Sequence, residues 1–386
     1  MSREHGFTLA ELMISMTVTL IAVGAALTTF SQGLIMNDTG SQLSDANQNL
    51  RAGGNQLLQD LKQAGRVIGA SGIPVPTGAG VTPFNRPGPV GTVPYPLTFS
   101  LVLDPSNPSN LPSISSGYQL GPNVIGEPTD VITIMTVDEF MPSIQTPPVT
   151  PGTPSTIEGT IAPNGQSVTL SATSQWLLGD PANLTPAMQV GDLVLFSNPI
   201  WTAIHTITST DATHIYFGLS PNANDWFNFN QFNAPMVPLM LIKLPLNTTG
   251  AWTQQTTMYR VMMITYYVDF FGGTTPLLTK VVNNWAPQAL AGVVEDLNFT
   301  FDLVDGVTNP TTVNSLPCPT AIELICGSVN PAAGVTYNSN QIRKVNVHMG
   351  VRSEYMSRPL HDYLRNHVNT AVDIRNLASV DRYVTN

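Results

Sequence analysis

Charged residues are scarce in this sequence. Asp, Glu, Lys and Arg make up 10% of its 386 residues, against about 25% in an ordinary soluble domain. The formal net charge of −10 argues against a general electrostatic grip on nucleic acid, so no nucleic-acid partner is expected. A hydrophobic share of 42% excludes broad disorder. Together with 32 Pro and 30 Gly, this composition favours a β-rich domain outside the cytoplasm over a cytosolic helical enzyme.

Cysteine is nearly missing. The two cysteines, Cys318 and Cys326, are too few for a four-ligand structural zinc site, and they are not spaced as C-x-x-C. In an exported domain we expect them to close a short loop as a disulfide. An unstrained bridge of this kind contributes about 2–3 kcal/mol to stability.

The residue patterns of common enzymes are also missing. The sequence has no G-x-S-x-G elbow, no P-loop and no dinucleotide fingerprint. Its histidines form no paired metal-ligand motif; they are His5, His205, His214, His348, His361 and His367. We therefore expect no catalytic residue, no metal and no cofactor, and a protein that is not an enzyme.

The N-terminal region holds a long stretch without charge. From Leu12 to Phe30 no residue is charged, and most are apolar. As a helix, Phe7–Phe30 would be about 36 Å long, enough to cross a bilayer core of about 30 Å. Residues 1–6 form a short polar leader that ends in Gly6, before the apolar stretch begins. An ordinary secretory signal has its cleavage site after the apolar region, which this segment does not match. The simple alternative to a cleaved leader is an uncleaved membrane anchor.

Glu11 distinguishes these two interpretations. It is the only charge between Phe7 and Met36 and sits one helical turn into the apolar segment, where a carboxylate costs roughly 2.5–3.5 kcal/mol on insertion scales. Cleavage after Gly6 would create an α-amine at Phe7, with a pKa near 7.7–8. That amine on a neighbouring subunit could neutralise Glu11 inside a bundle of apolar helices.

The segment Gly6-Phe7-Thr8-Leu9 followed by Glu11 resembles the class III signal of type IV pilins and type II secretion pseudopilins. The resemblance implies cleavage between Gly6 and Phe7 by a prepilin peptidase, N-methylation of Phe7, and use of Glu11 to set subunit register. It also implies major and minor pilins and an inner-membrane assembly platform as partners. The protein would then be a single-pass inner-membrane protein with a periplasmic domain, and would lie at the pilus or cell surface after assembly.

The helix is predicted to continue beyond the membrane. Apolar and small residues recur at three- and four-residue steps, as on one face of a helix: Leu43, Ala46, Leu50, Gly53, Leu57, Leu61, Ala64 and Ile68. We therefore expect a membrane helix over 7–36, an amphipathic continuation over 37–70, and a globular domain over 71–386. Within that domain, 71–185 is predicted to be a variable insertion rich in Pro and Gly.

Short β-type segments separated by turn residues follow the helix. They predict an α+β fold, in which the long helix packs on mainly antiparallel sheets. The tail around His361 and His367 is predicted to be helical or irregular. The predicted strands are Leu97–Leu103, Asp130–Val137, Ser167–Leu170, Leu193–Ser197, Trp201–Ile207, His214–Leu219, Met258–Phe270, Leu277–Val282, Val293–Val304 and Ile342–Ser353.

Several further segments resemble the PilW-type minor pilins. They are Arg51 with Leu57–Gly65, Val190-Gly191-Asp192, Val345–Arg352 and the closing Val372–Leu377. This resemblance implies a structural subunit that initiates, primes or caps a type IV pilus. The alternatives are a minor pseudopilin of a type II secretion system, a pilin-stalked adhesin, and a membrane-anchored hydrolase or carbohydrate-binding module.

One aromatic segment suggests a binding role. Trp226, Phe227 and Phe229 lie among Asn and Gln residues in a predicted loop. They could contact a sugar, a surface or a neighbouring pilin, which would serve cell adhesion. The competing interpretation is that the rings are buried in the core.

Overall fold

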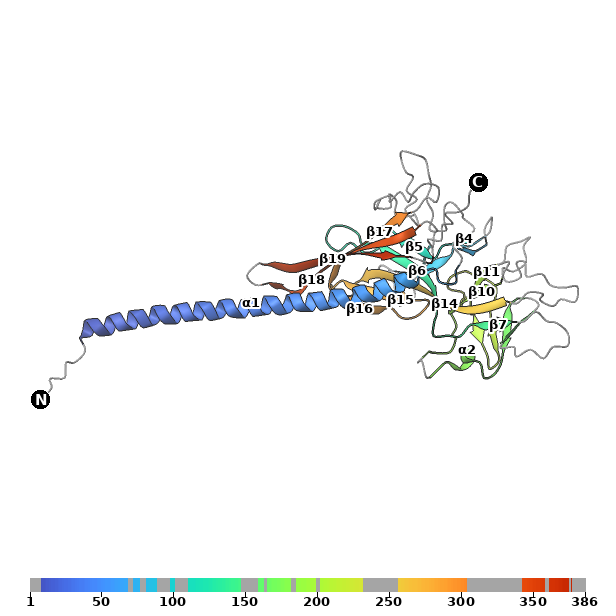
Figure 1. Ribbon diagram of the computed structural model, residues 1–386, viewed down its shortest axis with the longest axis horizontal. Coiled ribbons are helices and arrows are strands. Elements are labelled where there is room, and N and C mark those ends of the chain that lie inside the picture. The colour runs from blue at the N-terminus through green and yellow to red at the C-terminus, as the bar shows by residue number, and fades with distance from the viewer. Residues whose placement is uncertain are drawn as a thin grey trace, which may run out of the picture.

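The computed structural model describes residues 8–68, 72–76, 81–88, 98–100, 110–146, 159–162, 165–181, 185–198, 202–231, 256–303, 342–357, 361–374 and 376. One long helix leads into a body of antiparallel sheets (Figure 1). The predicted α+β class is confirmed.

Helix α1 spans Leu9–Gln63, 55 residues, which corresponds to about 82 Å of helix. Figure 1 shows its N-terminal half projecting away from the sheets. The predicted packing face is confirmed, since Ala46, Leu50, Gly53, Leu57 and Leu61 are all buried. After Gln63 the chain leaves the helix in a series of turns that ends at Ile68.

The largest sheet has eight strands arranged around β14 (Thr256–Asp269). On one side β14 pairs with β10 and β15, and on the other with β7 and β6. The remaining strands extend the sheet through β11, β16 and β5. Besides β14, its members are β5 (Ile114–Gly117), β6 (Val131–Val137), β7 (Ile144–Thr146), β10 (Leu193–Ser197), β11 (Thr202–Thr206), β15 (Leu277–Val282) and β16 (Gln288–Gly292).

A second sheet has three strands in the order β17-β18-β19. They are β17 (Val294–Leu303), β18 (Ile342–Ser357) and β19 (Asp362–Asp373). The prediction of a helical or irregular tail is wrong for β19, which pairs with β18 along most of its length. Its even-numbered residues from Leu364 to Val372 are at least partly covered and its odd-numbered residues from Arg365 to Asp373 are exposed, which is the two-residue period of a half-covered strand.

Smaller elements complete the described part of the chain. A four-stranded sheet has the order β12-β13-β9-β8, and two short pairs join β1 with β4 and β2 with β3. Their bounds are β1 (Ile73–Pro74), β2 (Asn85–Pro87), β3 (Thr98–Ser100), β4 (Asn110–Leu111), β8 (Gly159–Ile161), β9 (Ser167–Leu170), α2 (Gln175–Leu178), β12 (Ser209–Thr210) and β13 (His214–Tyr216). Each segment predicted as a strand contains one.

The main core lies where α1 meets the two larger sheets. Leu57 and Leu61 of α1 are fully buried there, with Leu278 of β15 and Met349 of β18. A separate core lies between the large sheet and the four-stranded sheet, around Trp176 and Phe217. The helix is therefore fixed to the domain by its second half alone.

Candidate assembly site

The first turn of α1 is closed by Thr8 and Glu11. The Thr8 backbone N–H and hydroxyl donate to Glu11 Oε2 at 3.0 and 2.9 Å, and the Glu11 N–H donates to Thr8 Oγ1 at 3.3 Å. This reciprocal capping box satisfies backbone donors that a helix start otherwise leaves unpaired. It also holds the carboxylate near the positive end of the helix dipole. Both hydrogen bonds to the carboxylate use Oε2, so Oε1 can still accept a hydrogen bond from a neighbouring molecule.

The rest of the first half of α1 has the surface of a membrane helix. Its large apolar side chains are exposed on all sides, including Leu9 at 80%, Leu20 at 69% and Met36 at 75%. Its hydroxyls bond back to the helix, as Thr17 does to the Met13 carbonyl at 2.7 Å and Thr19 to Ser15 at 2.7 Å. In the part of the chain that the structure describes, α1 is the one helix long and apolar enough to span a membrane.

Some predicted site residues lie outside the described part of the chain. Gly6 and Phe7 precede its first residue, Thr8, and Cys318 and Cys326 fall in the gap between 303 and 342. The cleavage site, the methylation site and the disulfide therefore stay predictions.

Asp60 joins the second half of α1 to the large sheet. Its Oδ2 accepts the Tyr266 hydroxyl of β14 at 2.5 Å and lies 2.5 Å from Lys280 Nζ of β15. Gln56 donates to Oδ1 at 3.2 Å. Burial, with the Asp60 carboxylate beside it, raises the pKa of Tyr266 well above its usual range. The network fixes the rotation of α1 over the sheet, because its partners come from two strands.

Gly53 allows α1 to lie close to β16. A Cβ built at Gly53 would lie 2.7 Å from Ala291 Cβ and 2.9 Å from Leu278 Cδ2. The neighbouring Gly54 has room, since its Cβ would meet only Met349 Cε, at 3.4 Å. A side chain at 53 would therefore push the helix away from the sheet.

The end of α1 is held by three polar contacts. Gly65 N–H donates to the Met135 carbonyl at 2.9 Å, and Thr136 Oγ1 donates to the Gln63 carbonyl at 3.0 Å. Asn376 Nδ2 donates to the Ala64 carbonyl at 3.1 Å. The closing segment of the chain thus returns to the end of the first helix.

The aromatic segment lies mostly inside the domain. Phe227 is 2% and Phe229 0% exposed, and their rings stack at 5.8 Å. Asp225 accepts the backbone N–H groups of Phe229 and Asn230, which folds the segment back into the core. The surface-binding hypothesis is therefore wrong for Phe227 and Phe229, whose rings reach no surface. Trp226 is partly buried against the same core.

The Gly191-Asp192 pair before β10 has a structural role. Gly191 has φ +92°, a left-handed conformation that favours glycine. Asp192 follows it into the interior and binds Arg260 of β14 at 2.8 Å, with Asp138 3.6 Å from the same guanidinium. Burial raises the pKa of Asp192 although Arg260 opposes the shift. This buried charge cluster joins three segments of the large sheet.

Two of the described histidines, His205 and His348, make contacts within the fold. His205 is buried between Phe196 and Phe217, with Nδ1 3.0 Å from Asn230 Oδ1, and burial lowers its pKa to about 4. His348 lies on the outer face of β18, with Nε2 2.9 Å from Asp296. Among the described residues no group of three or more His, Cys, Asp or Glu side chains could hold a metal ion.

Sequence reasoning missed the partners of Asp60. An acidic residue between Leu57 and Leu61 on an apolar helical face is a detectable signal, since burial of a lone carboxylate is costly. Its partners Tyr266 and Lys280 lie more than 200 residues away in sequence. Nothing near them in the chain marks them as partners of the helix.

A comparison with known families identifies the start of the chain. Residues 1–27 match the prokaryotic N-terminal methylation motif. No curated protein and no solved structure matches the chain.

The matched residues contain Gly6, Phe7 and the capped Glu11, and they run into the exposed apolar half of α1. The motif implies processing by a prepilin peptidase and association with other pilins. The N-terminus of this chain therefore carries the class III signal of type IV pilin-like proteins.

Proposed function

We propose that this protein is a structural, non-enzymatic minor pilin of the PilW type, which helps to initiate, prime or cap a type IV pilus. The observation that carries the proposal is the setting of Glu11. It is a lone carboxylate in the first turn of an exposed apolar helix, within the methylation motif. Such a group requires a partner in the membrane, and the Phe7 amine of an adjacent subunit has the opposite charge.

The size of the domain supports a low-copy role. Most of the 386 residues follow α1, and the described ones include several sheets, with β16, β18 and β19 packed on its second half. A body of this bulk is difficult to repeat along a close-packed shaft. Display at the tip or base of a filament needs no such repetition.

The proposed route follows from the two halves of the helix. The subunit waits in the inner membrane with its domain in the periplasm, in contact with the assembly platform. Pairing of Glu11 with the N-terminal amine of a neighbouring subunit places the apolar half of α1 among the helices of other major and minor pilins. The second half, fixed by Asp60, carries the domain to the pilus surface.

A minor pseudopilin of a type II secretion system would share every one of these features. Co-purification with pilus subunits, rather than with secretion pseudopilins, separates the two assignments. The carbohydrate-binding alternative has lost its motivating feature, because Phe227 and Phe229 are buried.

The test is the mass of the N-terminus after expression with and without a prepilin peptidase. Loss of residues 1–6 and gain of a methyl group on Phe7 are expected only with the peptidase. An intact leader in cells whose peptidase processes a control pilin would reduce the apolar helix to a plain anchor and leave Glu11 unexplained.

A further inference from the structure

The hairpin of β18 and β19 runs beside α1 toward its N-terminal half (Figure 1). The Asn366 side chain of β19 donates a hydrogen bond to Asn47 of α1, so these two residues lie at the same height along the helix axis. Asp362, four residues nearer the end of the hairpin, lies about 13 Å further along. That distance equals the rise of about nine helical residues. The hairpin end therefore lies level with about residue 38 of α1.

The exposure of residues along α1 independently places the start of the folded domain at the same height on the helix. Every residue from Thr8 to Asp38 is exposed, and Thr39 is the first to be partly covered, followed by Gln42 and Leu43. Asp38 is also the first charged residue after Glu11. The folded domain thus begins where the uncharged stretch ends, with no spacer between them.

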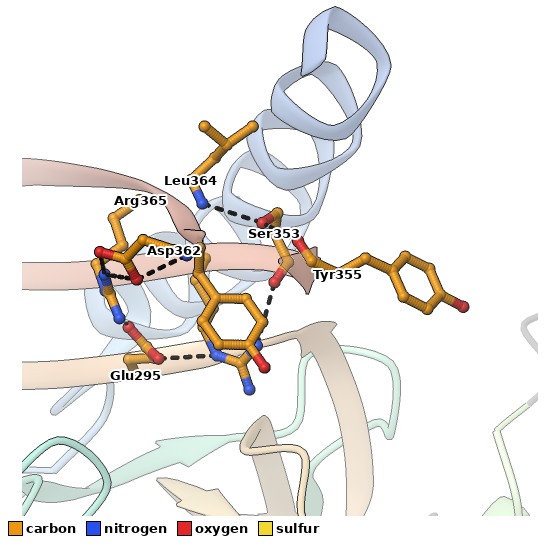
Figure 2. A network of polar contacts seen from close by, with 8 residues as sticks. Glu295, Ser353, Tyr355, Asp362, Leu364 and Arg365 are labelled. Atoms are coloured by element: carbon orange, nitrogen blue, oxygen red, sulfur yellow. Dashed lines mark hydrogen bonds and ion pairs between the residues drawn. The ribbon is translucent and has the colours of Figure 1, made fainter. Parts of the chain in front are cut away.

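A bulge shapes the end of the hairpin. The pairing register shifts between Arg352 and Met356. Ser353 Oγ accepts the Leu364 N–H at 3.1 Å and donates to the Tyr355 carbonyl at 2.7 Å (Figure 2). The alternation of the strand is broken there, so Tyr355 and Met356 are both exposed, at 67% and 49%. Figure 2 shows the Tyr355 ring pointing away from the network.

The charges beside the bulge neutralise one another. Glu295 of β17 binds Arg352 at 2.7 Å and Arg365 at 2.8 Å through its two oxygens. Arg365 also binds Asp362 at 3.0 Å, and the Arg352 guanidinium stacks on Tyr363 at 3.8 Å. Two arginines and two carboxylates therefore balance. Glu354 is exposed next to Tyr355 and adds one negative charge.

We propose that this hairpin end, with Tyr355 and Met356, lies in the headgroup layer of the membrane that α1 spans. The apolar stretch of α1 ends at Met36, which places the end of the hydrocarbon core there, with a headgroup layer of about 5–8 Å beyond it. A core of about 30 Å then begins near Thr17, so Glu11 lies toward the headgroup layer of the opposite face. Met356 pairs with Tyr363, level with about residue 40 of α1, which is about 6 Å past Met36. Tyrosine is enriched at this depth, because its ring is apolar and its hydroxyl can stay hydrated. The proposal rests on the proposed function, since it requires α1 in a bilayer.

The experiment places a fluorescent amino acid at one position of the full chain in phospholipid vesicles. The positions are Met356, Leu20 in the apolar half of α1, and Phe140 as a matched control. Phe140 is 64% exposed and follows Glu139, which pairs with Arg66 just beyond the far end of α1. Thr39, where the domain begins, and Gln63, the last residue of α1, are about 36 Å apart along the helix, so the probe at 140 lies far from the proposed headgroup layer. Lipids with a spin label in the headgroup or deep in the acyl chain serve as quenchers, and thermal unfolding checks each labelled protein.

Headgroup labels are expected to quench the probe at 356 at least twofold more strongly than the probe at 140. Deep labels should quench the probe at 20 and leave 356 largely unaffected. Equal, weak quenching at 356 and 140, with the probe at 20 strongly quenched, would overturn the hairpin proposal and leave the membrane helix intact. Weak headgroup quenching at 356, together with shielding of the probe from a water-soluble quencher only when a second pilin is reconstituted, would also overturn it, in favour of a protein partner.

Failure of the probe at 20 would instead contradict the membrane span on which the proposed function rests. Should a label at 356 prevent folding, Tyr355 carries the probe, and the same comparison with Phe140 decides.

Discussion

The two halves of α1 are one continuous helix in two environments. From Leu9 to Asp38 the apolar residues surround the helix and are exposed, as in a segment that faces lipid or other apolar helices. From Thr39 to Gln63 they are confined to one face, which packs on β16, β18 and β19. The comparison shows that the distribution of apolar residues around the axis determines what each half contacts.

Each half also contains one acidic residue in an apolar setting. Glu11 finds its partners within its own turn, at Thr8. Asp60 finds them on two strands of the sheet, at Tyr266 and Lys280. We therefore expect the stability of the domain to depend on Asp60 and not on Glu11.

The largest effect on stability is expected for Asp60→Ala. Removing one member of a buried ion pair typically costs about 3–5 kcal/mol, because the remaining charge has lost its partner. Here Lys280 and the Tyr266 hydroxyl would both be left in the interface. Denaturant unfolding should show a fall of about 3 kcal/mol, and Asp60→Asn, which keeps an acceptor for Tyr266, should fall by less. Equal stability of Asp60→Ala and the native protein would refute the structural role of the network.

A second pair of variants tests the close approach of α1 to β16. Gly53→Ala introduces a Cβ 2.7 Å from that of Ala291, so we expect a loss of about 1–3 kcal/mol from overpacking. Gly54→Ala has room, and the gain in helix propensity should stabilise the protein by up to about 1 kcal/mol. Opposite signs in thermal unfolding support the packing described. The same sign for both would contradict it.

Acid should destabilise the sheets through His205. The pKa of His205 is lowered by burial from 6.5 to about 4, so its contribution to stability is complete above about pH 6.5 and is lost as the pH falls toward 4. Linkage gives a loss of about 1–2 kcal/mol between pH 7 and pH 5. In His205→Gln this part of the pH dependence should disappear, as measured by denaturant unfolding at the two pH values. His214→Gln, at a half-buried position on β13, is the control.

The smallest effect on the domain is expected for Glu11→Ala. The change removes a capping box at the exposed end of α1, about 1 kcal/mol of local helix stability, and touches no residue of the sheets. The melting temperature of the domain should therefore stay within about 1 °C. Incorporation into filaments, measured by immunoblot of sheared pili, should fall at least tenfold. Normal incorporation would remove the main support for the proposed function.

Much of the fold could be predicted from the sequence because its signals are local. The apolar stretch, the packing face from Ala46 to Ile68 and the β-type segments each depend on residues close together in the chain. β19 was missed because apolar residues do not alternate with polar ones along it: Leu364, Val368 and Val372 recur only every fourth residue, with Asn366 and Thr370 between them. It becomes a strand through pairing with β18, a tertiary effect.

The candidate site divides in the same way. Glu11 was found because a single charged residue in a long apolar stretch can be recognised from the sequence alone. The joint around Asp60 and the hairpin network around Glu295 could not be found, because their members lie on separate elements. The aromatic segment was misinterpreted for a related reason. The backbone hydrogen bonds that Asp225 accepts from Phe229 and Asn230 turn the rings inward, and composition gives no sign of them.

The uninterrupted course of α1 has a mechanical consequence. Leu9 and Gln63 belong to one rod, and the domain is attached to that rod without a linker. A pull or twist applied to the apolar half in the membrane is transmitted to the sheets through the helix itself, because α1 is continuous from Leu9 to Gln63. The orientation of the domain is thus set by the rotation of the helix about its own axis, and a turn of one residue, about 100°, would point a different face of the sheets toward the neighbouring subunits.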